Sequence, residues 1–142
     1  MKIPVTISLI VLIFFMGYRQ QQKVKLHCIV KGIEERTGTV EVALYNNEES
    51  FPIDGEEYLS KSLPVKKDTL AFTFCLTPGD YAIALYHDRN GNGRCDKNRL
   101  GIPRERFGFS NNIHPRLRAP SFRKATIHLE ADTTIVIRLI KY

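Results

Sequence analysis

The sequence is poor in the residues that most often carry catalysis or bind transition metals. It has three cysteines and four histidines, and these form no cluster with the spacing of a metal site. No serine or cysteine stands in a recognisable nucleophile motif. The sequence therefore gives no support for a zinc site or for a hydrolase that works through a covalent intermediate.

Long apolar runs are also lacking, and the one present lies at the N-terminus. Residues 3–16 form an apolar run of 14 residues, whereas a membrane-spanning helix needs about 20. Met1-Lys2 precedes the run and a polar segment ending at Gln22 follows it. This order predicts a signal peptide over residues 1–22 without a clear cleavage motif, the alternative being an uncleaved N-terminal anchor. The expected location is the periplasm or the extracellular space, and any membrane contact would come only through an uncleaved leader.

An exported chain with three cysteines can form one disulfide and leaves one thiol over. The alternation of apolar residues predicts that Cys28 points inward, and that Cys75 lies on the face opposite Phe72 and Phe74. Because these two thiols point in different directions, they are not expected to pair. A bond between Cys75 and Cys95 is the alternative, and we predict no disulfide. No cysteine directly follows the apolar run, so the sequence does not predict a lipoprotein.

Residues 23–142 predict a single all-β domain. Apolar residues alternate with polar ones in short segments separated by turn residues, and no long amphipathic helix or repeat is present. The pattern predicts an antiparallel β-sandwich of about seven strands. The expected strands are 24–30, 40–44, 58–66, 70–76, 81–86, 125–129 and 134–140.

Two turns are predicted to make hairpins in this sandwich. Thr77-Pro78-Gly79-Asp80 has the sequence of a type II turn, with Gly79 at the position of positive φ, so residues 70–86 would be one hairpin. Residues 130–133 would join the last two strands as another. Between them, residues 87–122 are rich in Gly, Pro, Asn and Arg and predict a long irregular loop, which in a compact domain is usually functional or structurally specialised.

This loop begins with the spacing of a calcium site. Side-chain oxygens at alternate positions around a glycine bend are what a calcium ion requires. The predicted ligands are Asp88, Asn90, Asn92, the carbonyl of Arg94, and Asp96. The twelfth position, where a bidentate Glu is usual, is Arg99, so any calcium bound would be held weakly, with a Kd of about 10⁻⁴ to 10⁻³ M. The alternative is a metal-free loop in which the same oxygens accept backbone N–H bonds.

Positive charge is concentrated in the same part of the chain. The formal net charge is +6, and residues 88–118 carry eight Lys or Arg against three Asp or Glu, for a local charge of +5. Such an asymmetry favours an anionic partner or surface in the cell envelope. Nucleic acid is not expected as a partner of an exported sandwich.

The segment from Pro78 to Asn112, followed by "APSFRKATIHL", resembles a widespread family of exported bacterial proteins, the domain-of-unknown-function family 2141. The resemblance implies a β-sandwich similar to the prealbumin-like and carboxypeptidase-regulatory-like domains, and it implies no activity. The chain departs from the family pattern in its local enrichment in arginine and in Cys95. The matching residues are Pro78-Gly79, Tyr81, His87-Asp88, Gly101-Ile102-Pro103, Glu105, Gly108-Phe109-Ser110-Asn111-Asn112, Pro120-Ser121-Phe122 and Ala125.

Two functions are compatible with these features. The first is an exported, non-enzymatic binding or scaffolding module of the cell envelope that acts through the 87–122 loop. The alternative is a small enzyme that acts on a glycan or small molecule through His87, Asp88 and Glu105. A histidine at a strand end is more often a hydrogen-bonded structural residue, so the module is the preferred prediction. Phe107 and Phe109 are predicted to belong to the core.

Overall fold

The computed structural model of the protein describes residues 22–116 and 118–142. The predicted signal peptide therefore lies, apart from Gln22, outside the described residues. Two short helical segments accompany the strands, η1 (Ser110–Asn112) and α2 (Phe122–Ala125). The strands are β1 (Val24–Lys31), β2 (Thr39–Tyr45), β3 (Leu59–Pro64), β4 (Leu70–Leu76), β5 (Gly79–Asp88), β6 (Phe107–Phe109), β7 (Ile127–Leu129) and β8 (Thr133–Arg138).

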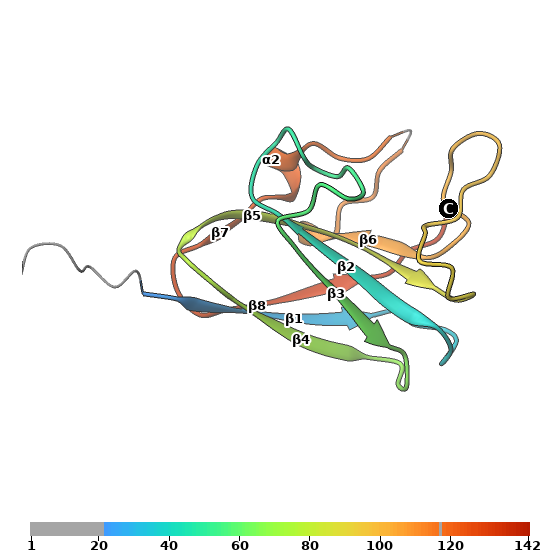
Figure 1. Cartoon of the computed structure of the whole chain (residues 1–142), viewed down its shortest axis with the longest axis horizontal. Helices are drawn as coiled ribbons and strands as arrows, with labels where there is room; N and C mark the ends of the chain where they lie inside the picture. The colour runs from blue at the N-terminus through green and yellow to red at the C-terminus, as the bar shows by residue number, and fades with distance from the viewer. Residues whose placement is uncertain (1–21, 117) are drawn as a thin grey trace, which may run out of the picture.

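The strands form two facing sheets, which confirms the predicted β-sandwich (Figure 1). One sheet has the order β4-β1-β8, and the other has the order β3-β2-β5-β6, with β7 also paired to β5. Alternating apolar residues of β1 are fully buried against those of β2 and β5 because each strand turns one face to the other sheet. Leu26, Leu44 and Ile83 are among these core residues.

Both predicted hairpins are wrong. Strands β4 and β5 are consecutive but belong to different sheets, as do β7 and β8, so each turn crosses from one sheet to the other. The last strand, β8, pairs in parallel with β1, whereas the other strand pairs of the described chain are antiparallel. Period-two patterns predict which side chains are buried but not which strand is the neighbour, and this is why the error arose.

Gly79 does not have the predicted positive φ. It is the first residue of β5 and pairs with Leu129 of β7, so its backbone belongs to the strand. The crossing between β4 and β5 is instead secured by Tyr81, whose hydroxyl donates to the carbonyl of Thr77 at 2.9 Å. The sequence identified a turn here and assigned it the wrong conformation.

The predicted orientation of the cysteines is confirmed, since Cys28 is buried and Cys75 is exposed. Both thiols are free, and so is that of Cys95. Within residues 22–116 and 118–142, no helix has the length and apolar character to cross a membrane. The predicted loop also contains two elements that the sequence did not indicate, β6 and η1, and α2 begins at its last residue, Phe122.

Candidate functional site

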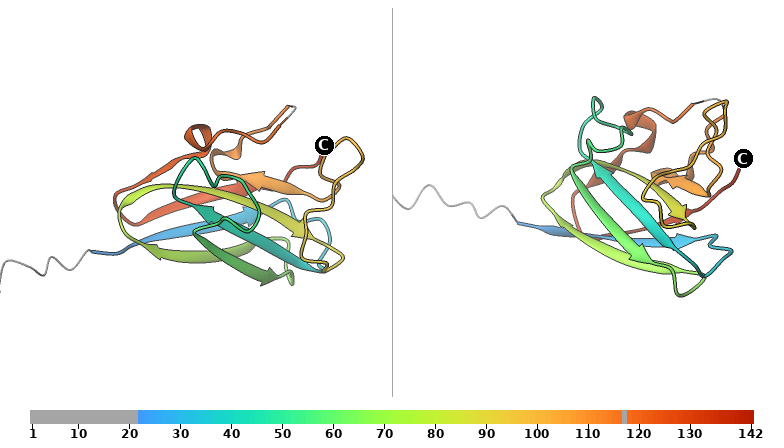
Figure 2. Two further views of the ribbon diagram at one scale, coloured as in Figure 1. Left: turned by 45° about the horizontal axis from the view of Figure 1, so that its top comes forward. Right: turned by 45° about the vertical axis from the view of Figure 1, so that its right-hand side comes forward.

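The connection between β5 and β6, residues 89–106, is hereafter the cationic loop. It rises from one end of the sandwich, and the C-terminus lies beside it in the views of Figures 1 and 2. Strand β5 fixes where it starts, because its last residues lie opposite the start of β2, with Asp88 facing Thr39. The loop therefore begins from the centre of the five-stranded sheet and not from a free edge.

Asp88 organises the first half of the cationic loop. Its side chain is only 1% exposed, and both carboxylate oxygens accept backbone N–H bonds. Oδ1 accepts from Gly91 at 2.7 Å and from Asn92 at 3.2 Å, and Oδ2 accepts from Gly93 at 2.7 Å. Charge-assisted bonds of this kind replace the water that a buried carboxylate would lose.

Asn90, Asn92 and Asp96 form the outer layer of the same loop. The side-chain amides of Asn90 and Asn92 donate to the two carboxylate oxygens of Asp96, at 2.8 and 3.0 Å. Their own carbonyl oxygens accept backbone N–H bonds from Asn92 and Arg94, at 3.2 and 2.9 Å. The structure thus brings together the four side chains that the sequence singled out.

Their hydrogen bonds bear on whether calcium fits. The carbonyl oxygens of both asparagines and the carboxylate of Asp88 already accept N–H bonds, and both asparagine amides face Asp96. A calcium ion would have to displace these donors or reverse the two amides. Among the described residues, no group of three or more His, Cys, Asp or Glu side chains is arranged as metal ligands. The residues as arranged do not fit a resident calcium ion, and the calcium site stays a prediction of the sequence.

Glu105 closes the base of the loop. It is 4% exposed, and its two carboxylate oxygens accept from the backbone of Arg89 at 3.1 Å and of Asp96 at 3.3 Å. It therefore ties the returning chain to the outgoing one, next to the unit held by Asp88. Residue type and spacing alone did not reveal this bridging role.

The tip of the loop, residues 97–104, is a compact bend. Lys97 and Pro103 pair as an antiparallel bridge, and the N–H of Asn98 donates to the carbonyl of Ile102 at 2.8 Å. The side-chain oxygen of Asn98 accepts from Leu100 at 2.9 Å and from Ile102 at 3.0 Å. Asn98 thus holds the bend from inside, while Ile102 and Pro103 are partly buried and the side chains of Lys97, Arg99, Leu100 and Arg104 are exposed.

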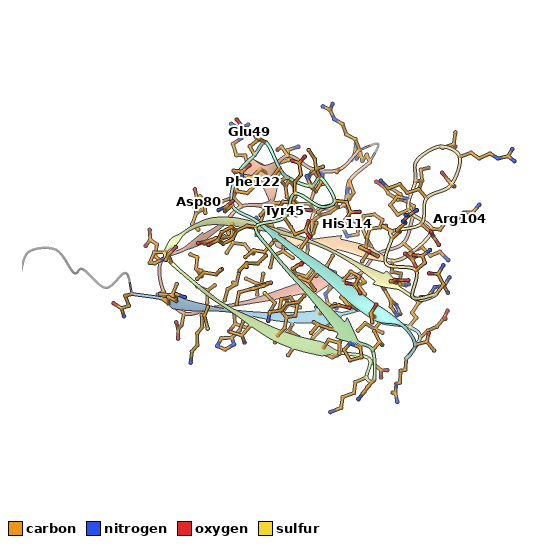
Figure 3. The ribbon with its side chains drawn as sticks, viewed as in Figure 1. Tyr45, Glu49, Asp80, Arg104, His114 and Phe122 are labelled. Carbon is orange, nitrogen blue, oxygen red and sulfur yellow. The ribbon has the colours of Figure 1, made fainter. Side chains whose placement is uncertain are left out.

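The basic residues of the cationic loop divide into two groups. Arg89 and Arg106 lie at its base and form ion pairs with Glu35 and Glu34, respectively. Four others are exposed and make no ion pair within the described part of the chain; they are Arg94, Lys97, Arg99 and Arg104. Arg104 is labelled in Figure 3, where it lies at the end of the molecule opposite the start of β1. The uncompensated charge of the loop is therefore carried by the tip and by Arg94 before it, and not by the base.

The three residues of the enzyme hypothesis are all buried. His87 is 1% exposed, and its Nε2 lies 2.7 Å from the carbonyl of Thr37. Asp88 and Glu105 are engaged with backbone N–H groups, as described above. No hydrogen bond links any two of the three side chains within residues 22–116 and 118–142. The three side chains hold the backbone in place, and as arranged they do not present an acid–base pair to a substrate.

The second part of the predicted 87–122 loop fastens the sheets together. Ser110 is fully buried, and its hydroxyl accepts from the N–H of Ile83 at 3.0 Å. Asn112 has positive φ, and its side chain bonds to the outer edge of β8 as a neighbouring strand would, closing an otherwise free edge. Phe107 and Phe109 are buried, as predicted. The Gly-Phe-Ser-Asn-Asn segment is therefore structural.

Cys95 lies within the cationic loop but is not poised for reaction. Burial raises the pKa of its thiol to about 11, and the nearby charge of Glu105 acts in the same direction. A thiol that is protonated at neutral pH is a poor nucleophile.

Comparison with known proteins bears on this arrangement. Residues 29–137 match the family described as "Uncharacterized protein conserved in bacteria (DUF2141)". No curated protein and no solved structure matches the chain significantly. The matched range includes the whole cationic loop and the segment that fastens the sheets.

Proposed function

The chain belongs to this uncharacterised bacterial family, and we propose that it is an exported, non-enzymatic β-sandwich module of the cell envelope that binds an anionic partner through the cationic loop. The observation that carries the proposal is the separation of the loop into a neutralised base and a charged tip. Arg89 and Arg106 are ion-paired at the base, whereas the three basic residues of the tip, and Arg94 before it, are exposed and make no ion pair within the described residues.

The hydrogen bonding of the loop supports a binding role. Asp88 fixes the backbone that leads to the tip, and Asn98 fixes the bend of the tip itself, so little conformational entropy is left to lose when a ligand binds there. Long-range attraction between exposed charges also speeds encounter and weakens with added salt. The buried side chains of the enzyme hypothesis offer no comparable support, so we keep the binding module as the proposal.

The proposal is tested by removing charge from the tip. The variant K97Q/R99Q/R104Q should bind heparin, used as a soluble polyanion, about tenfold more weakly than the wild type. The matched control R116Q/R123Q/K124Q loses the same formal charge at exposed positions elsewhere and should bind like the wild type. Both variants should keep the wild-type denaturation midpoint because the substituted side chains are exposed. Equal weakening in both would show that total charge matters and the loop does not.

A further inference from the structure

Leu100 stands at the tip of the cationic loop, almost entirely in water. It is 83% exposed, more than any other large apolar side chain of the described residues. The bend holds it there, since the Leu100 N–H donates to Asn98 and Gly101 follows with φ of +77°. An apolar side chain fixed in water gains free energy from any apolar environment that receives it.

Exposed cations lie close to this leucine in the sequence of the tip. Lys97, Arg99 and Arg104 lie within four positions of it, and the tip carries no acidic side chain between residues 97 and 104. Cations attract the loop to anionic headgroups, and an apolar residue among them can enter the boundary between headgroups and acyl chains. An acidic glycan would satisfy the cations but would offer nothing to the leucine.

The sequence led us to expect membrane contact only through an uncleaved leader, but we infer that the anionic partner is a lipid membrane surface, with the cations of the tip on the headgroups and Leu100 inserted among them. The inference rests on the proposed anion-binding function and names its partner class. Because the tip bend is closed by its own hydrogen bonds, the loop docks without refolding, and the N–H groups of Asn98, Leu100, Gly101 and Ile102 keep their partners at the surface of the bilayer.

The sequence contains no tryptophan, so a single indole can report on the tip alone, whatever the N-terminal segment does. In the L100W variant, vesicles of phosphatidylglycerol and phosphatidylcholine should shift the emission to shorter wavelength, and brominated acyl chains should quench it. Vesicles of phosphatidylcholine alone should do neither. The matched control L59W places the indole on the exposed edge strand β3 and should show no shift with either vesicle.

A second pair of substitutions separates this inference from the proposed function. L100S should bind the phosphatidylglycerol vesicles about tenfold more weakly and bind heparin as the wild type does. K97Q should weaken both interactions, by about fivefold for the vesicles. If heparin binding depends on the tip cations while the indole of L100W stays in water, the membrane inference is wrong and the anion-binding function stands. If K97Q and K97Q/R99Q/R104Q also leave heparin binding unchanged, the membrane inference and the anion-binding function are both wrong.

Discussion

The carboxylate of Asp88 accepts a hydrogen bond from the backbone N–H of Gly93, with an oxygen–nitrogen distance of 2.7 Å. The bond joins the last residue of strand β5 to the first half of the cationic loop. Two further N–H donors on the same buried carboxylate make the strand end and the loop a single hydrogen-bonded unit. The conformation of the loop is therefore set by the sandwich that carries it.

Replacing Asp88 should release this unit. D88A leaves three backbone N–H groups without their acceptor, so we expect the free energy of unfolding to fall by about 2 to 4 kcal/mol. Urea denaturation measures the change. The control D54A removes an exposed carboxylate from another loop and should change stability by less than about 0.5 kcal/mol. A D88A midpoint equal to that of the wild type would show that the loop conformation does not depend on this carboxylate.

Gly38 lies against the same strand end. A Cβ at this position would be 2.0 Å from the carbonyl oxygen of Asp88, and its φ of +69° is already unfavourable for other residues. Gly91 has the same φ of +69°, but a Cβ there would meet nothing within 4 Å. We expect G91A to cost about 1 kcal/mol and G38A to cost more than about 3 kcal/mol, because the backbone must also move apart. Equal midpoints for the two variants in urea would contradict the close approach.

Calcium should have little effect on this loop. A site with a Kd of about 10⁻³ M would add about 1.4 kcal/mol of stability in about 10 mM calcium. Because the oxygens of Asp88, Asn90 and Asn92 already accept N–H bonds, we expect no such gain in a thermal unfolding experiment, with magnesium as the control. A gain that is specific to calcium and lost in D96N would establish the calcium site that the sequence predicts.

The three thiols should react at different rates because they differ in burial. Burial raises the pKa of Cys28 to about 12, and burial together with Glu105 raises that of Cys95 to about 11. Both stay protonated in the folded chain at pH values where an unfolded thiol, with its ordinary pKa of 9.0, ionises. Iodoacetamide should therefore label the exposed Cys75 first. Mass spectrometry of peptides measures the rate of labelling at each cysteine. Labelling of Cys95 as fast as Cys75 would contradict the expected order of thiol reactivity.

The same raised pKa values make the free energy of unfolding depend on pH. The contribution of the two buried thiols is fully present below pH 9.0 and should be lost as the pH rises through their folded pKa values.

The sequence predicted the core well because burial in a sandwich follows a period of two. The alternation in β1, from Val24 to Val30, identified the inward face correctly, including Cys28. Pro64 correctly indicated that β3 is an edge strand. The sequence could not predict which strands pair. Strands β1 and β8, for example, pair in parallel although they lie more than 100 residues apart, and no local sequence pattern marks such a pair. The short strand β6 was missed because three buried residues are too few to show a period.

The sequence indicated which residues belong to the candidate site, but it did not predict the hydrogen bonds that they make. The spacing of Asp88, Asn90, Asn92 and Asp96 singled out four side chains of one bend, in which the two asparagines contact Asp96 and Asp88 binds the backbone. Spacing cannot tell a cation from a backbone N–H as the partner of an oxygen, since both favour the same residue types at the same turns. It also cannot tell that Arg89 is neutralised by Glu35, which lies far away in sequence. The sequence located the excess positive charge in residues 88–118, but the division into an ion-paired base and an unpaired tip was recognisable only in the folded chain.

The central claim is that the tip of the cationic loop is the binding surface, and an NMR titration tests it most directly. A short heparin fragment would be added to the isotope-labelled protein while the backbone amide signals are followed. We predict that the largest shifts fall within residues 94–104 and vanish in K97Q/R99Q/R104Q. The exposed basic residues of the other segment, Arg116, Arg123 and Lys124, should shift little. Shifts centred on those residues, or spread evenly over the basic surface, would contradict the account.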